Sequence, residues 1–122
     1  MTVTESGFEF VVLHHTGFGE PHFDLMLEVS DHDALLTFRS PIWPITYPVQ
    51  LTHLGEHRRA YLTYEGAVSG GRGQVRRVAS GTYTLSGDGV NIGITFESGT
   101  DHVPIRISDT GTCTPMPDGI SA

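Results

Sequence analysis

The stretch FEFVVLHHTGFGEPHFDLMLEV, residues 8–29, contains the strongest structural pattern in the chain. Residues 8–15 are rich in Phe and Val, as β-strands are, and two glycines and a proline interrupt the pattern in residues 16–21. From His22 onward the residues alternate between two strand faces, one with His22, Asp24, Met26 and Glu28 and the other wholly apolar, with Phe23, Leu25, Leu27 and Val29. The pattern predicts two strands joined by a short loop, with the apolar face in the core.

The rest of the chain carries similar short patterns. Further strands are predicted at residues 35–39, 60–65, 74–78, 81–85, 90–96 and 103–107. A single helical turn is allowed at residues 54–58. The 122 residues include 15 Gly and 7 Pro, so short elements and many turns are expected rather than long helices.

About eight short strands in a chain of this length favour an all-β fold, a compact antiparallel β-barrel with little helix. A two-sheet sandwich is the alternative architecture. We expect residues 1–107 to form a single barrel domain and residues 108–122, which are rich in Thr, Pro, Gly and Asp, to form a loose C-terminal tail.

Length and composition exclude several classes of protein. A chain of 122 residues can bury one hydrophobic core without disulfides or bound metals to stabilise it. It is too short for two such cores, which excludes a two-domain enzyme. The single cysteine, Cys113, cannot form an internal disulfide, and no apolar run approaches the roughly 18 residues that span a bilayer. We therefore expect a cytoplasmic protein without a membrane partner.

The charge balance is acidic, but the cations are gathered in one segment. Fourteen Asp and Glu residues oppose seven Arg residues and no Lys, and five of the seven arginines lie between residues 58 and 77. A net charge of −7 disfavours coating of a nucleic-acid duplex, whereas arginine forks bind phosphate oxygens bidentately. A small phosphate target is expected, with a solvated strand face as the alternative interpretation.

A potential metal site lies in the first two strands. His22 and Asp24 would project from one strand face about 6.5 to 7 Å apart, and a hairpin would bring His14 or His15 beside His22. Two imidazoles and one carboxylate suit Mn, Fe or Zn and leave positions for water and substrate. Histidines with purely structural contacts are the alternative.

A second constellation is His57 with Tyr61. Their spacing keeps both side chains on one face in either a strand or a helical turn. A histidine and a tyrosine hydroxyl can bind or protonate an anionic oxygen, although a surface histidine beside a packed tyrosine would show the same spacing.

These residues belong to a series of motifs that resembles the 3′-phosphoesterase domain of bacterial DNA ligase D, in its short free-standing form. The resemblance covers residues 8–85, roughly two-thirds of the chain, and rests on the order of the motifs rather than on any single one. The motifs are FVVLHH at 10–15, HFDLMLE at 22–28, His57-x-x-x-Tyr61-x-x-Tyr64-Glu65-Gly66, Gly73-x-Val75 and Gly81-Thr82-Tyr83.

The resemblance implies a manganese-dependent phosphoesterase on a compact β-barrel. Such an enzyme trims 3′ ends by removing a terminal ribonucleoside and hydrolysing the remaining 3′-phosphate. The metal ligands would be His15, His22 and Asp24, holding Mn²⁺, with Zn²⁺ or another divalent ion as an alternative. His57 and Tyr61 would contact the scissile phosphate or the leaving oxygen. The implied partners are DNA or RNA-containing 3′ ends and a ligase or polymerase of end repair.

The sequence departs from the family pattern near the expected ligands. Met26 stands where the family has an arginine that grips phosphate, so we expect Arg39 or Arg72 to bind phosphate instead. Leu13 replaces a glutamine of the family. The loop after residue 15 is one residue longer than in the family, which keeps His14 as an alternative ligand to His15.

Two other functions stay open as hypotheses. The first is a non-catalytic module that binds nucleic-acid ends or a metal. The second is a non-haem iron oxygenase, in which His102 would be a third ligand and Arg106 an acid-binding residue.

Overall fold

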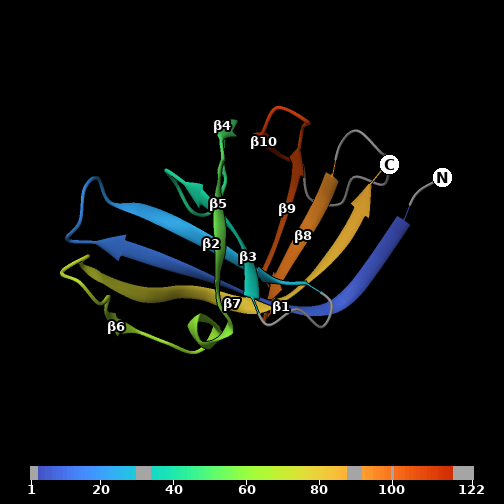
Figure 1. Ribbon diagram of the computed structural model, residues 1–122. Coiled ribbons are helices and arrows are strands. Elements are labelled where there is room, and N and C mark those ends of the chain that lie inside the picture. Colours follow the sequence, from blue (N-terminus) through green and yellow to red (C-terminus); the bar gives the residue numbers. More distant parts are fainter. Residues whose placement is uncertain (1–2, 30–33, 88–91, 100, 117–122) are drawn as a thin grey trace.

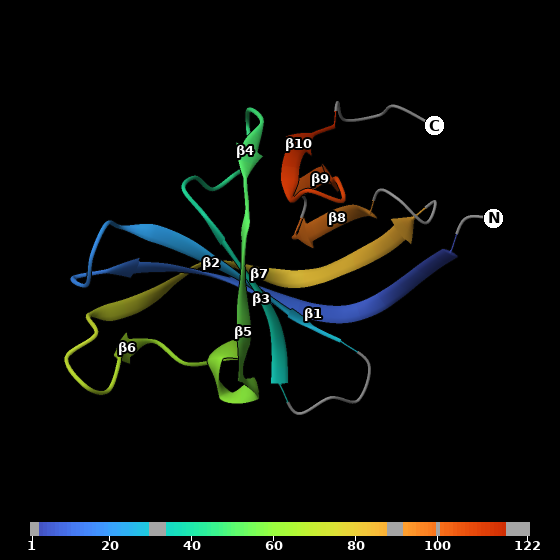
Figure 2. The same cartoon turned by 45° about the horizontal axis from the view of Figure 1, so that its top comes forward.

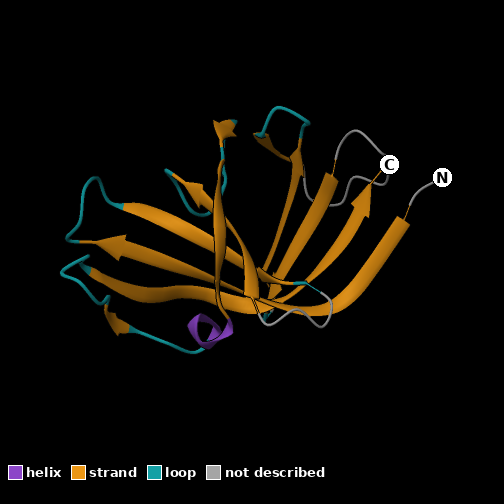
Figure 3. Ribbon diagram, in the orientation of Figure 1, coloured by secondary structure: helices purple, strands orange, loops and turns teal. Residues whose placement is uncertain are grey.

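A computed structural model describes residues 3–29, 34–87, 92–99 and 101–116 of the chain. Within these residues it has ten strands and one short 3₁₀ helix (Figure 1, Figure 3). The elements are β1 (Val3–Thr16), β2 (His22–Glu28), β3 (Ala34–Ser40), β4 (Val49–Gln50), β5 (Thr52–Arg58), η1 (Arg59–Leu62), β6 (Gly66–Ala67), β7 (Gln74–Gly87), β8 (Ile92–Ser98), β9 (Asp101–Ile107) and β10 (Thr112–Pro115). The described part of the chain has no helix long and apolar enough to cross a membrane.

The strands form one antiparallel sheet that curls into a nearly closed barrel, which confirms the predicted fold class. The strand order is β4-β10-β9-β8-β7-β1-β2-β3-β5, with β6 beside β7. Its two ends are neighbours in the sequence, because only Leu51 separates β4 from β5. β4 pairs with β10, β5 pairs with β3, and the Leu51 amide donates to the Gly111 carbonyl over 3.0 Å. Residues 49–58 therefore close the barrel and cover its edges (Figure 2).

The hairpin of β1 and β2 is buried on both faces, although the alternation predicted only one core face. Its inner face joins a core of buried residues that fills the barrel: Phe10, Val12, Leu25, Leu27, Ile45, Val49, Leu51, Tyr83, Ile94, Phe96, Ile105, Ile107 and Cys113. Its outer face carries a smaller set, called here the outer cluster: Val11, Leu13, Met26, Leu35 and Val75. Side chains from η1 and the segment after it pack on the outer cluster. The ribbon of η1 lies outside the barrel (Figure 1).

Several predicted element boundaries were wrong. The strands predicted at 74–78 and 81–85 are one strand, β7, with a bulge at Val78 where the pairing to β1 shifts by one residue. Residues 54–58 belong to strand β5 rather than to a helical turn, because they pair with β3. The predicted strand at 60–65 begins instead in the helix η1.

The predicted loose tail was also wrong in part. Thr112–Pro115 form β10, which pairs with β9 on one side and β4 on the other. Cys113 is fully buried in the barrel core. The Thr and Pro residues of this segment made it look like a loop, although it forms a strand of the barrel. The rest of the predicted tail, residues 117–122, lies outside the described residues.

The reactivity of Cys113 tests this closure. Burial raises the pKa of the Cys113 thiol to about 11, and only the thiolate reacts with alkylating reagents. At about pH 8 we expect native Cys113 to react about 100-fold more slowly than the thiol of the urea-unfolded chain. The measurement is the time course of alkylation by mass spectrometry, and a loose tail would give similar rates in both states.

Candidate metal centre

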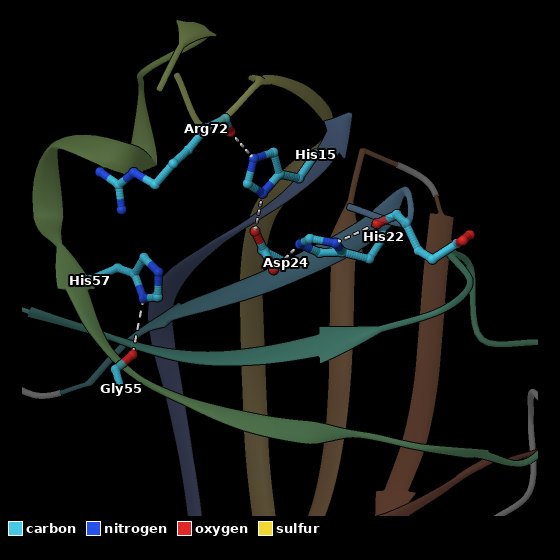
Figure 4. A network of polar contacts seen from close by, with 7 residues as sticks. His15, His22, Asp24, Gly55, His57 and Arg72 are labelled. Carbon is cyan, nitrogen blue, oxygen red and sulfur yellow. Dashed lines mark hydrogen bonds and ion pairs between the residues drawn. The ribbon is translucent and has the colours of Figure 1, made fainter. Parts of the chain in front are cut away.

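The β1–β2 hairpin brings together His15, His22 and Asp24. His15 at the end of β1 lies directly opposite His22 at the start of β2, and Asp24 follows two residues later. All three side chains therefore share the outer face of the hairpin. One ligand atom from each lies within 4.8 Å of the others. His22 Nε2 is 3.2 Å from Asp24 Oδ1, and His15 Nδ1 is 3.7 Å from Asp24 Oδ2 (Figure 4).

Backbone carbonyl groups determine which ring nitrogen each histidine presents. His15 Nε2 lies 2.6 Å from the carbonyl oxygen of Arg72, and His22 Nδ1 lies 3.0 Å from that of Glu20. A carbonyl oxygen only accepts, so these nitrogens donate and the other nitrogen of each neutral ring keeps its lone pair. Those nitrogens, His15 Nδ1 and His22 Nε2, face Asp24. Metal-binding histidines in proteins are oriented in the same way.

Two buried atoms of the cluster have no hydrogen-bond partner in the part of the chain that the structure describes. His22 and Asp24 are almost fully buried, and neither His22 Nε2 nor Asp24 Oδ1 has a hydrogen-bond partner among the described residues. Leaving such a group unsatisfied costs about 1 to 3 kcal/mol. A divalent cation between the three side chains would satisfy both atoms. The donor set of two imidazoles and one carboxylate fits such an ion.

The alternative ligands lie elsewhere. His14 points to the opposite face of β1, where its ring stacks on Phe23 with centroids 4.6 Å apart and planes at 15°. Neighbouring strand residues face opposite ways, so only one of the adjacent histidines can lie beside His22, and it is His15. His102, the ligand of the oxygenase hypothesis, lies on β9 with its Nδ1 3.5 Å from Glu97 Oε1.

His57 and Tyr61 also lie on the outer side of the sheet. His57 on β5 pairs with Leu35, a member of the outer cluster, and Tyr61 of η1 packs against that cluster. Their rings meet edge to face with centroids 6.1 Å apart, although the two residues lie in different elements rather than on one strand or one helical turn. His57 Nδ1 donates to the Gly55 carbonyl over 3.0 Å, which leaves Nε2 for another partner. Figure 4 shows His57 to one side of the His15–His22–Asp24 cluster.

Arg39 lies next to the cluster. It stands directly opposite Asp24 in the pairing of β2 with β3, and is exposed on the same face. It borders a cavity of about 590 Å³ that His22 also lines. Met26, by contrast, is 2 % exposed within the outer cluster. A guanidinium can therefore approach a ligand beside His22 from β3 rather than from position 26.

Arg72 contributes through its backbone. Its guanidinium turns back to Ser69, with Nε donating to the Ser69 carbonyl over 2.7 Å, while its own carbonyl holds His15. The next residue, Gly73, has φ of +76°, and a Cβ there would lie 2.1 Å from the Thr16 carbonyl oxygen. Only glycine lets this loop approach the end of β1 so closely. Residue types could not have revealed the carbonyl contact, because every residue has a carbonyl group.

A scan against protein-family models and a search of curated proteins both found no match. The geometry of the His15–His22–Asp24 cluster and the order of the motifs in the sequence are therefore the features that point to a function.

Proposed function

We propose that the protein is a divalent-metal-dependent phosphoesterase that acts on the 3′ ends of nucleic acid, trimming a terminal ribonucleotide or a 3′-phosphate in DNA end repair. The observation that carries the proposal is the cluster of His15, His22 and Asp24. Its two ring nitrogens face one carboxylate, and two of its buried atoms, His22 Nε2 and Asp24 Oδ1, have no hydrogen-bond partner among the described residues. The substrate class, and Mn²⁺ as the metal, come from the resemblance to the 3′-phosphoesterase domain of DNA ligase D.

The cluster would hold the ion through His15 Nδ1, His22 Nε2 and the Asp24 carboxylate. When bound, a divalent ion polarises a phosphoryl oxygen and activates a water molecule. The chain supplies the orientation of these ligands, because the carbonyls of Arg72 and Glu20 already hold both rings in the required tautomers. Three protein ligands leave coordination positions for substrate and water.

Three further side chains would act on the phosphate itself. Arg39, exposed and opposite Asp24, would bind phosphoryl oxygens with its fork of N–H donors. His57, whose Nδ1–H is held by the Gly55 carbonyl, would donate the Nε2 proton of its imidazolium form to the leaving oxygen and return to the neutral ring. The ring of Tyr61 contacts that of His57. Its hydroxyl group would donate a hydrogen bond to the same phosphate.

A non-catalytic module that binds metal or a nucleic-acid end is the second candidate. It is favoured by the buried Met26, which leaves the cluster without the family's arginine on β2. Turnover separates the two candidates, since both require the metal ligands but only an enzyme releases product.

The deciding assay incubates the protein with primer-templates that carry a 3′-phosphate or a 3′-terminal ribonucleotide, with Mn²⁺ or with EDTA. We expect phosphate release or shortening of the primer that requires Mn²⁺ and falls at least about 100-fold in His22→Ala, because a ligand is lost. His14→Ala is the matched control, since His14 lies on the opposite face, and it should stay within about threefold of the wild type.

Two results would contradict the proposal. If wild-type protein binds Mn²⁺ in a calorimetric titration but turns over neither substrate, the non-catalytic module is the correct candidate. If His22→Ala binds Mn²⁺ as tightly as the wild type does, the metal centre itself is wrong.

The two arginines can be distinguished by the same assay. Arg39→Ala should lower kcat/KM by about 10- to 100-fold, because a charge-assisted hydrogen bond to phosphate is lost. Arg72→Ala should change it by less than about threefold, since Arg72 holds His15 through its carbonyl. The opposite order of effects would assign phosphate binding to Arg72.

A further inference from the structure

An aromatic side chain projects from the turn between β1 and β2, next to the metal cluster. Phe18 is 52 % exposed, and Gly17 and Gly19 on either side of it have φ of +82° and +69°. Glycine adopts these left-handed conformations without a steric penalty, so the turn can hold Phe18 away from the hairpin. Exposed apolar residues are common, so exposure alone assigns no role to Phe18.

The surroundings of Phe18 point to a ligand. Phe18, His22 and Arg39 line the same cavity of about 590 Å³, together with Gly19, Glu20, Pro21, Pro41, Gln50 and Thr52. This volume lies within the range of small-molecule sites, about 300 to 1,000 Å³. One cavity thus combines a candidate metal ligand, an exposed guanidinium and an aromatic ring at the tip of the hairpin.

The orientation of the Phe18 ring fits the same ligand. Its plane lies 18° from the plane of the His15 imidazole, with centroids 6.4 Å apart. Phe18 therefore lies on the cluster's side of the hairpin and leaves about half of its surface to solvent. A planar group stacked on this ring would lie near any phosphate bound beside His22 and Arg39. A nucleotide combines a planar base with a phosphate and fits all three features.

We infer that this cavity is a subsite for the base of the 3′-terminal nucleotide, with Phe18 as its stacking platform. The inference rests on the proposed function and specifies its substrate. Every base has a π-face, so stacking on Phe18 accepts any sequence.

Binding without turnover tests this subsite. The probes are two fluorescently labelled single-stranded oligonucleotides that end in a 3′-methylenephosphonate, which cannot be hydrolysed; one has its terminal base and the other is abasic at that position. Fluorescence anisotropy with Mn²⁺ gives Kd for the wild type, Phe18→Ala, Phe18→Trp and Tyr47→Ala. Tyr47 is the matched control, because it is 55 % exposed and does not line the cavity.

We expect Phe18→Ala to weaken binding of the base-bearing probe about 5- to 150-fold and to leave the abasic probe unchanged. Phe18→Trp should keep the preference for the base, and Tyr47→Ala should bind both probes as the wild type does. The inference is overturned if Phe18→Ala retains the wild-type preference, or if the wild type binds neither probe or both equally.

The proposed function fails separately from this subsite. Loss of the base preference in Phe18→Ala, combined with no product from either primer-template, would leave a nucleotide-binding site that is not an enzyme. Metal-dependent product release with no role for Phe18 would leave the enzyme and remove the subsite.

Discussion

The pairing of His15 with His22 across the β1–β2 hairpin is the constraint on which the candidate site depends. If β2 slipped by one residue, His22 and Asp24 would turn to the inner face and leave His15 alone. Burial prevents this slip, because Leu25 enters the barrel core while Met26 enters the outer cluster. Exchanging these faces would disturb two packed clusters at once. The hydrophobic core thus fixes the register, and the register assembles the cluster.

The cluster also depends on segments distant in the sequence. The Arg72 carbonyl reaches His15 from the loop before β7, and Gly73 allows that loop to approach Thr16. Barrel closure places β5 beside β3, which brings His57 to the outer face. The barrel therefore serves as a frame whose outer wall, rather than its interior, carries the His15–His22–Asp24 cluster. The whole chain carries a net charge of −7, and Arg39 offers a cation beside the cluster.

Much of this arrangement could be predicted from the sequence. The alternation from His22 placed His22 and Asp24 on one face, and short strands with many turns indicated a barrel. What could not be predicted depends on tertiary contacts: whether His14 or His15 faces His22 follows from the register of the hairpin. The strand character of Thr112–Pro115 follows from closure between β9 and β4, since its local composition favours a turn.

The side-chain roles were harder to anticipate than the strands. Arg39 and Arg72 were equivalent in sequence, and only the structure separates an arginine opposite Asp24 from one whose guanidinium turns to Ser69. Nothing in the sequence around Phe18, which lies between Gly17 and Gly19, predicted a functional role for it. Its position is informative only once the cavity beside His22 is known.

The most direct test of the central claim is the anomalous diffraction of Mn²⁺ in crystals of the protein. The account predicts one strong peak on the outer face of the hairpin, bonded to His15 Nδ1, His22 Nε2 and the Asp24 carboxylate, with no contact from His14. A peak elsewhere, or a histidine that binds the ion through the nitrogen now facing a backbone carbonyl, would contradict it.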